Sequence, residues 1–225
     1  MNLEQARFNM IEQQIRPWSV SDPVVLKLLR QVRREDFAPA AHKALAFADL
    51  ELPLRSPSEE ALRLGQCMLA PRIEARMLQD LAVQPHEKVL EIGAGSGYMA
   101  ALLAQRAQRV ISLEIEPELV KLARENLQKA GIRNVEVRQA DGAKGAPVES
   151  PFDVIVLSGS VAEVPHHLLA HLKRGGRLMA IVGDAPVMRA TLVRRSGEAE
   201  FCSSETWDTV VPRLLNFPAH SPFKF

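Results

Sequence analysis

The stretch Val89-Leu90-Glu91-Ile92-Gly93-Ala94-Gly95-Ser96-Gly97-Tyr98 decides the fold of this chain. Its first half is a short apolar run, which predicts a buried β-strand, and its second half alternates glycines before a predicted helix at 99–108. Glycines at such a turn let the backbone come close to a ligand, and the following helix offers free N–H groups and a positive dipole end. In an open parallel sheet ligands bind where loops leave the carboxyl ends of the strands, so the stretch predicts a ligand site.

Downstream of this loop, apolar strand-like runs alternate with segments of helical spacing. The predicted strands are 88–93, 109–114, 135–139, 152–158 and 177–182, and the predicted helices are 99–108, 117–129 and 167–173. This alternation predicts an α/β fold with a doubly wound, mostly parallel sheet covered on both faces. Two further runs, 190–194 and 207–215, are expected to pair antiparallel at the C-terminal edge of the sheet.

Upstream of the loop, residues 1–80 predict a helical extension. Asp22 can cap a helix that has Pro23 in its first turn, and Pro71 can open another helix. The prolines at 53 and 57 favour a loop over 53–64. We therefore divide the chain into an extension at 1–80 and a ligand-binding α/β domain at 81–225, expected to form one compact unit.

Three acidic residues indicate which ligand the loop holds. Glu91 lies two positions before the first glycine, and Glu114 ends the next strand, where a carboxylate can bond ribose hydroxyls. Asp141 follows the third strand and is placed to bond an adenine amino group. Gly95-x-Gly97-x-x-Ala100 also satisfies the loose dinucleotide fingerprint, which leaves a nicotinamide oxidoreductase as a competing interpretation. Such an oxidoreductase would not need Asp141.

The succession of Glu-x-Gly-x-Gly-x-Gly, a strand-end acid and an Ala-Asp-Gly turn resembles the class I methyltransferases that use S-adenosylmethionine (SAM). In those enzymes the first loop holds the amino-acid end of SAM, so the resemblance implies SAM as cofactor. The implied cofactor-binding residues are Glu91, Gly93, Ala94, Gly95, Gly97, Tyr98, Glu114, Ile115, Asp141, Gly142 and Ser158.

Segments outside the loop resemble one family, the protein L-isoaspartate O-methyltransferases. They include Arg33-Arg34-Glu35-Asp36-Phe37-Ala38-Pro39, Ala46-Phe47-Ala48-Asp49 and Gly65-Gln66. The tail, Trp207-Asp208-Thr209-Val210-Val211-Pro212-Arg213-Leu214, resembles the family's closing Val-x-Phe-Val-Pro-Leu run. The resemblance implies an enzyme that methylates the α-carboxylate of L-isoaspartyl residues in damaged proteins. The N-terminal extension and the tail would then cover a protein or peptide substrate.

One departure from the family affects the acceptor site. The family has Gly-Gln-Thr-Ile-Ser-x-Pro, with a hydroxyl near the transferred methyl, where this chain has Gly65-Gln66-Cys67-Met68-Leu69-Ala70-Pro71. Leu69 cannot donate a hydrogen bond, so no catalytic residue is assigned among Cys67, Met68 and Leu69. Two alternatives stay open: the same fold acting on a different acceptor, and a SAM-binding protein with little catalysis.

The composition of the chain limits the kinds of partner that we expect the protein to bind. Lys plus Arg number 28 against 27 Asp plus Glu, a net charge of +1, which gives no argument for nucleic-acid or membrane binding. The two cysteines and six histidines have no metal-ligand spacing, so no metal is expected. The N-terminus lacks the apolar core of a signal peptide, no apolar run is long enough to span a membrane, and no apolar stripe is left for a partner chain. We therefore expect a cytoplasmic monomer.

Overall fold

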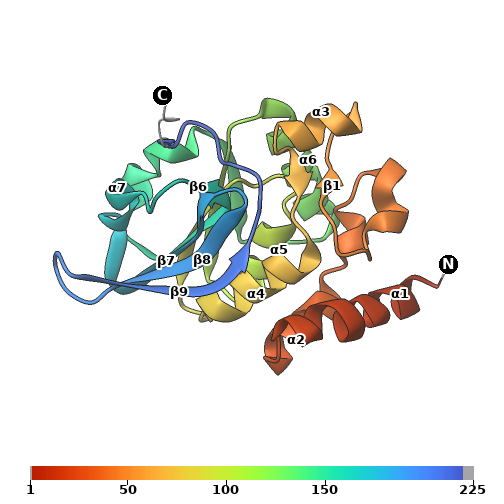
Figure 1. Cartoon of the computed structure of the whole chain (residues 1–225), viewed down its shortest axis with the longest axis horizontal. Helices are drawn as coiled ribbons and strands as arrows, with labels where there is room; N and C mark the ends of the chain where they lie inside the picture. Colours follow the sequence, from red (N-terminus) through yellow and green to blue (C-terminus); the bar gives the residue numbers. More distant parts are fainter. Residues whose placement is uncertain (1, 220–225) are drawn as a thin grey trace.

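The computed structural model describes residues 2–219 and is built around one twisted sheet of seven strands. The strand order is β5 (Val135–Gln139), β4 (Arg109–Glu114), β3 (Lys88–Ile92), β6 (Phe152–Val161), β7 (Leu172–Asp184), β8 (Val187–Arg195) and β9 (Phe201–Thr209). The first five strands in this order are parallel, and β8 and β9 pair antiparallel (Figure 1). The predicted mostly parallel sheet with an antiparallel C-terminal edge is confirmed.

The strand order places the ligand edge. From β3 the chain steps outward to β4 and then to β5, and it returns on the other side of β3 to form β6. The direction of winding therefore reverses between β3 and β6, and the loops that leave their carboxyl ends diverge and open a crevice there.

Helices cover the two faces of the sheet unequally. The helices α4 (Pro71–Leu81), α5 (Tyr98–Ala104) and α6 (Pro117–Lys129) pack in one hydrophobic cluster with alternate strand residues such as Val89 and Val154. The other face carries Leu90 and Ile155 in a second cluster with the short helix α7 (His166–Leu169). The period of two along each strand explains why neighbouring residues belong to different clusters.

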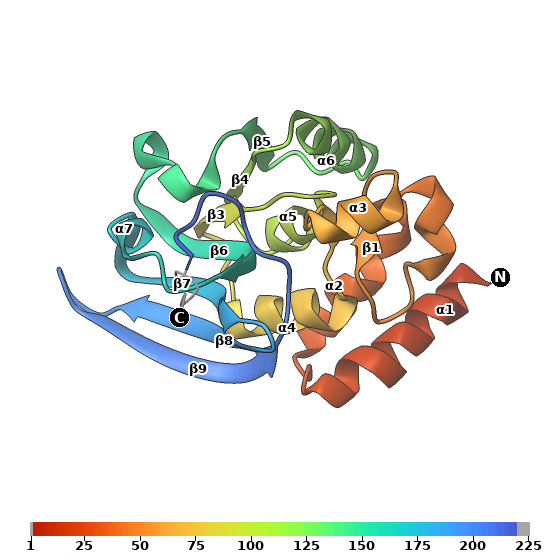
Figure 2. The ribbon, with the colours of Figure 1, turned by 45° about the horizontal axis from the view of Figure 1, so that its top comes forward.

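The N-terminal extension lies against the face that carries α4 and α5 (Figure 2). It contains α1 (Leu3–Met10), α2 (Pro23–Gln31) and α3 (Ser58–Arg63), and a small antiparallel pair, β1 (Leu52–Pro53) with β2 (Cys67–Met68). As the sequence predicts, Asp22 caps α2 by accepting from Val24 N at 2.7 Å, and Pro71 opens α4.

Several predicted boundaries differ from the structure, and the helix expected at 99–108 ends at Ala104. The segment 53–64 is not all loop, because Pro57 directly precedes α3. The helix expected at 167–173 is only α7, and Leu172 instead begins β7 by pairing with Phe152. The strand expected at 207–215 ends at Thr209, and the chain then leaves the edge of the sheet. Pro212 has no N–H to offer a sheet, which explains why the ladder is not continued.

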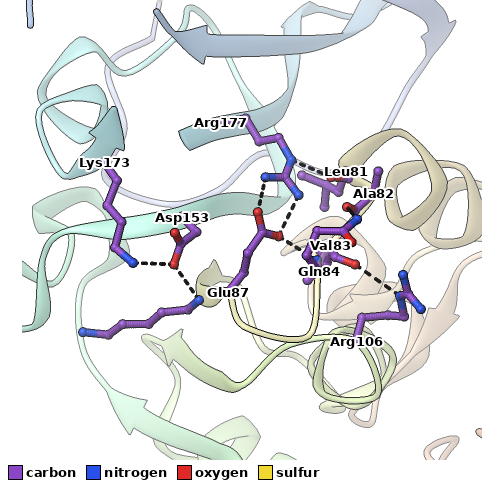
Figure 3. A network of polar contacts seen from close by, with 10 residues as sticks. Leu81, Ala82, Val83, Gln84, Glu87, Arg106, Asp153, Lys173 and Arg177 are labelled. Atoms are coloured by element: carbon purple, nitrogen blue, oxygen red, sulfur yellow. Dashed lines mark hydrogen bonds and ion pairs between the residues drawn. The ribbon is translucent and has the colours of Figure 1, made fainter. Parts of the chain in front are cut away.

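A network of polar contacts lies at the starts of the central strands, at the opposite end of these strands from the glycine loop (Figure 3). Arg177 on β7 donates from Nη1 and Nη2 to the two carboxylate oxygens of Glu87 at 2.7 and 2.9 Å, and from Nε to the carbonyl of Leu81 at 2.5 Å. Asp153 accepts from Lys173 Nζ at 2.7 Å and from the backbone N–H of Lys88 at 2.8 Å. These contacts hold the start of β3 and the end of α4 to the sheet, at the ends of the strands that lie away from the crevice.

Candidate functional site

The glycine loop leaves β3 in a conformation that requires glycine. Gly93, Gly95 and Gly97 have φ values of +93°, +53° and +83°, in the region that other residues rarely adopt. The N–H of Gly93 donates to the carbonyl of Leu113 at 2.8 Å, which ties the loop to β4. A Cβ at Gly97 would lie 3.2–3.3 Å from Ala123 of α6, so this glycine also lets α5 and α6 approach.

The strand-end acid Glu114 organises the floor of the site. One of its oxygens accepts from the N–H of Gly95 at 2.9 Å, and the other accepts from the N–H groups of Ile115 and Glu116 at 2.9 and 3.1 Å. A charged carboxylate is thus held at the carboxyl end of β4, beside the glycine loop.

Asp141 occupies the corresponding place after β5. Its Oδ1 accepts from the N–H of Ala143 at 3.1 Å and so caps a short 3-10 turn. The neighbouring Gly142 packs so closely on β3 that a Cβ there would lie 2.2 Å from Cγ2 of Ile92. Glycine is therefore required at 142 for the Asp141 turn to reach the crevice.

A cavity that is partly open to solvent lies over these strand ends. The residues expected from sequence that line it are Cys67, Gly93, Gly95, Glu114, Ile115, Asp141, Gly142 and Ser158. Residues from β3, β4, β5 and β6, or from the loops that follow them, therefore meet at one site with residues of the N-terminal extension.

The remaining residues expected from sequence lie outside the lining. These are Met68, Leu69, Glu91, Ala94, Gly97 and Tyr98, all in or beside the loop or β2. Glu91 is fully buried beneath the site, where the hydroxyls of Ser112 and Ser158 donate to it at 2.5 and 3.0 Å. Burial raises the pKa of Glu91 to about 8 despite these hydrogen bonds. Glu91 therefore holds Ser158, which itself lines the cavity.

Tyr98 joins the loop to the N-terminal extension. Its buried ring meets Phe37 edge-on with centroids 5.5 Å apart, and the Arg34 guanidinium lies 5.4 Å from the ring centroid. Arg34 also pairs with Glu74 and donates to the carbonyl of Leu69 at 2.7 Å. The extension is thus packed directly behind the glycine loop.

In the segment Gly65–Pro71, which departs from the family pattern, the side chains of Cys67 and Leu69 lie in different surroundings. Cys67 lines the cavity, whereas the Leu69 side chain is buried, with 6% exposed, away from the lining. Burial, with Glu51 and Glu74 nearby, raises the pKa of the Cys67 thiol to about 12. Cys67 therefore stays a neutral thiol at physiological pH.

A C-terminal segment, residues 211–217, forms the roof of the cavity, and we call it the roof. The Ser160 N–H donates to the carbonyl of Pro212 at 2.8 Å, and the Leu214 N–H donates to the carbonyl of Ser160 at 2.9 Å. Figure 2 shows the dark blue chain after β9 running past β6. A Cβ at Gly93 would lie 3.0 Å from Cδ2 of Leu214, so the roof nearly touches the glycine loop.

Sequence reasoning missed several lining residues. They include Gln66, Glu116, Arg213, Leu214, Leu215 and Phe217. Pro212 was the available signal for the roof, because a proline in a strand-like run argues against a central strand. No group of His, Cys, Asp and Glu among residues 2–219 is arranged to hold a metal ion, and within the same range no helix has the length and apolarity to cross a membrane.

The chain matches the family model described as "Protein-L-isoaspartate(D-aspartate) O-methyltransferase" over residues 5–211. It is 41% identical over 198 residues to the Syntrophobacter fumaroxidans protein named protein-L-isoaspartate O-methyltransferase 1, covering 88% of this chain and 89% of that one. It is 40% identical over 195 residues to a Methanoculleus marisnigri protein of the same enzyme name, covering 86% and 85%.

Solved structures agree on the fold. A protein-L-isoaspartate O-methyltransferase superposes with a TM-score of 0.77 at 25% identity, covering 93% of this chain and 65% of that one. A Plasmodium falciparum protein, described as a putative enzyme of this kind in complex with S-adenosyl-L-homocysteine, gives 0.74 at 18% identity, covering 95% and 98%.

Proposed function

The chain belongs to the protein-L-isoaspartate(D-aspartate) O-methyltransferase family, and from this premise we propose that it methylates the α-carboxylate of L-isoaspartyl residues in damaged proteins. It is a SAM-dependent methyltransferase, as its family and named relatives indicate. The observation that carries the proposal is the cavity at the carboxyl ends of β3, β4, β5 and β6, bounded by the glycine loop and the roof.

The residues of the cavity fit SAM. In our proposal Glu114 bonds the ribose hydroxyls, Asp141 bonds the adenine amino group, and the loop at Gly93 and Gly95 receives the amino-acid end. The support is that backbone contacts already hold both carboxylates at the crevice and that Gly93 and Gly95 carry no side chains to block the approach. The carboxylates also favour a ligand that carries a positive sulfonium.

The chemistry asks little of the protein beyond placement. SAM, when bound, supplies an electrophilic methyl on its sulfonium. A carboxylate acceptor is ionised near neutral pH, so the chain needs no general base. Its residues align the acceptor oxygen with the methyl and exclude water, and the roof at Leu214 and Phe217 is placed for this second task.

Cys67 must not compete with the acceptor. A thiolate in this cavity would itself be a strong nucleophile for the methyl, whereas a thiol with a pKa of about 12 is almost wholly protonated at neutral pH. The proposal therefore assigns Cys67 to the wall of the site and not to the reaction.

The test is methyl transfer from labelled SAM to an isoaspartyl peptide, with the matching aspartyl peptide as control. SAM binding is measured in parallel by calorimetry. We expect transfer to the isoaspartyl peptide alone. SAM binding without transfer to either peptide would reject the proposed acceptor and keep the cofactor, and the search would then pass to other carboxylate or apolar acceptors.

Two finer points belong to the same proposal. We propose that the enzyme acts in the cytoplasm, which the free thiols of Cys67 and Cys202 support. We also propose that it works as a monomer on protein and not on nucleic acid, which the net charge of +1 supports. Light scattering of the purified enzyme with and without an isoaspartyl protein checks the oligomeric state.

A further inference from the structure

Arg213 stands in the roof with a hydrogen-bond donor that has no protein partner. Its Nη2 donates to the carbonyl of Gly183 at 2.8 Å and to Oδ1 of Asp184 at 2.5 Å, which fixes the guanidinium against the end of β7. Its Nη1 is shielded from solvent and has no acceptor among residues 2–219. Buried donors almost always have a partner in folded proteins, so this one calls for an explanation.

The charge of the cavity indicates what that partner is. Three carboxylates, those of Glu114, Glu116 and Asp141, line the cavity, and among the described lining residues only Arg213 carries a positive charge. A negatively charged acceptor would be repelled by most of the lining and attracted at Arg213. A guanidinium also matches the planar geometry of a carboxylate.

The position of Arg213 agrees with an acceptor role. A Cβ at Gly65 would lie 2.9 Å from Cβ of Pro212 and 3.6 Å from the carbonyl oxygen of Arg213, so the roof sits over the Gly65–Cys67 segment. Leu69, which has no hydroxyl to donate, follows this segment two residues after Cys67. In the closing Val-Pro-Leu run that the tail resembles, leucine follows the proline, and this chain has Arg213 there.

We propose that Arg213 binds the α-carboxylate of the methyl acceptor and supplies the donor that Leu69 cannot. This inference rests on the proposed function, because it takes the acceptor to be a carboxylate. The Arg213 side chain is 30% exposed, so an acceptor carried on a protein surface can reach the roof from outside.

The experiment is a calorimetric titration of two peptides into the enzyme saturated with S-adenosylhomocysteine. One peptide carries an isoaspartyl residue with its free α-carboxylate, and the other is its α-carboxamide analogue. The variant is Arg213→Met, and the matched control is Arg189→Met, which removes an exposed arginine of β8 that pairs with Glu205 and Asp208. Arg213→Lys, which keeps the charge, is the second variant should the methionine variant fold poorly.

We expect Arg213→Met to weaken binding of the carboxylate peptide about 10- to 100-fold, and we expect the affinity of Arg213→Lys to lie between those of Arg213→Met and the wild type. For the carboxamide peptide and for SAM itself, the affinity of every variant should stay within about twofold of the wild-type value, because the lost contact is specific to the carboxylate. Arg189→Met should bind the carboxylate peptide as tightly as the wild type does. A similar loss for both peptides, or no loss for either, would overturn the proposal. Weakened SAM binding with unchanged peptide binding would instead assign Arg213 to the carboxylate of SAM.

The methyl-transfer assay separates this inference from the proposed function. If the wild type binds the carboxylate peptide through Arg213 but transfers no methyl, the proposed function fails, and of the inference only carboxylate binding by Arg213 stands. If the wild type transfers methyl and Arg213→Met has the same KM for the peptide, the inference fails and the proposed function stands.

Discussion

The carboxylate of Asp141 caps the N–H of Ala143, and in our proposal it also binds the adenine amino group of SAM; two substitutions separate these roles. Asp141→Ala should weaken SAM binding by about 1–3 kcal/mol through a lost charged hydrogen bond, and it should also remove the cap on Ala143 N. Asp141→Asn keeps an oxygen for that cap and is expected to restore the melting temperature but only part of the affinity. Calorimetry and thermal unfolding of both variants check this. An unchanged affinity in the alanine variant would make Asp141 only a cap.

Glu91 should make stability fall as pH rises. Its pKa is raised to about 8 in the folded protein by burial, so between about pH 5 and 8 the unfolded chain has released this proton and the folded chain still holds it. The folded state binds more protons in that window, and the contribution of Glu91 to stability is therefore lost with rising pH, by at most about 1.4 kcal/mol per pH unit.

Glu91→Gln isolates this effect, because glutamine keeps the shape and does not titrate. In urea unfolding from pH 5 to 8, the variant should gain stability relative to the wild type as pH rises. The comparison is needed because burial also raises the pKa of Glu74, to about 7, with the same sign. A stability difference that does not change with pH would show that Glu91 is ionised in the fold.

At the scale of elements, the position of the roof depends on the absence of a side chain near the end of β6. A Cβ at Gly159 of β6 would lie 2.8 Å from Cγ and Cδ2 of Leu214 and 3.1 Å from the carbonyl of Pro212. Gly159→Ala should therefore push the roof outward, costing about 1–3 kcal/mol of stability and speeding proteolysis near residue 213. Ser160→Ala, which loses one bond to the carbonyl of Val211, is the milder comparison, at about 1 kcal/mol. Equal proteolysis of Gly159→Ala and the wild type would contradict this account.

The elements differ in how far sequence could place them. The runs that became β3 and β4 are apolar, end in glycine or acid and alternate with helices, so local pattern and fold agree there. The roof could not be placed, since it is held by backbone bonds to Ser160, and such bonds leave no mark on side-chain pattern. The predicted boundary between α7 and β7 was wrong because the pairing of Leu172 with Phe152 overrides a weak helical preference.

The site shows the same division. The acids and glycines were readable because each sits directly after a strand, and the topology then brings strand ends together without further information. Tyr98 and Glu91 were expected beside the ligand, and the structure places them just outside the lining, in the layer that supports it. Sequence adjacency to a ligand loop does not say which way a side chain points.

At the scale of the whole molecule, the buried side chain of Arg34 contacts both the extension and the α/β domain. Arg34 pairs with Glu74 inside the extension, and its guanidinium lies 5.4 Å from the ring centroid of Tyr98 in α5. One hydrophobic cluster also runs from Met10 to Met179 and beyond. The two parts should therefore unfold together.

Arg34→Ala tests that union. It would leave Glu74 buried without its partner and should cost about 3–5 kcal/mol, whereas Arg34→Met combined with Glu74→Leu should recover much of the loss. Urea unfolding followed by far-ultraviolet circular dichroism and by Trp18 and Trp207 fluorescence should give one coincident transition in the wild type. Two separated transitions would mean that the extension is an independent unit.

The roof also affects the order in which the site can form during folding. The glycine loop and the roof line the same cavity, yet Gly95 and Val211 are separated by 115 intervening residues. Contacts between segments so far apart carry a large loop-closure cost and form slowly. A refolding chain should therefore regain its secondary structure before it regains a closed site.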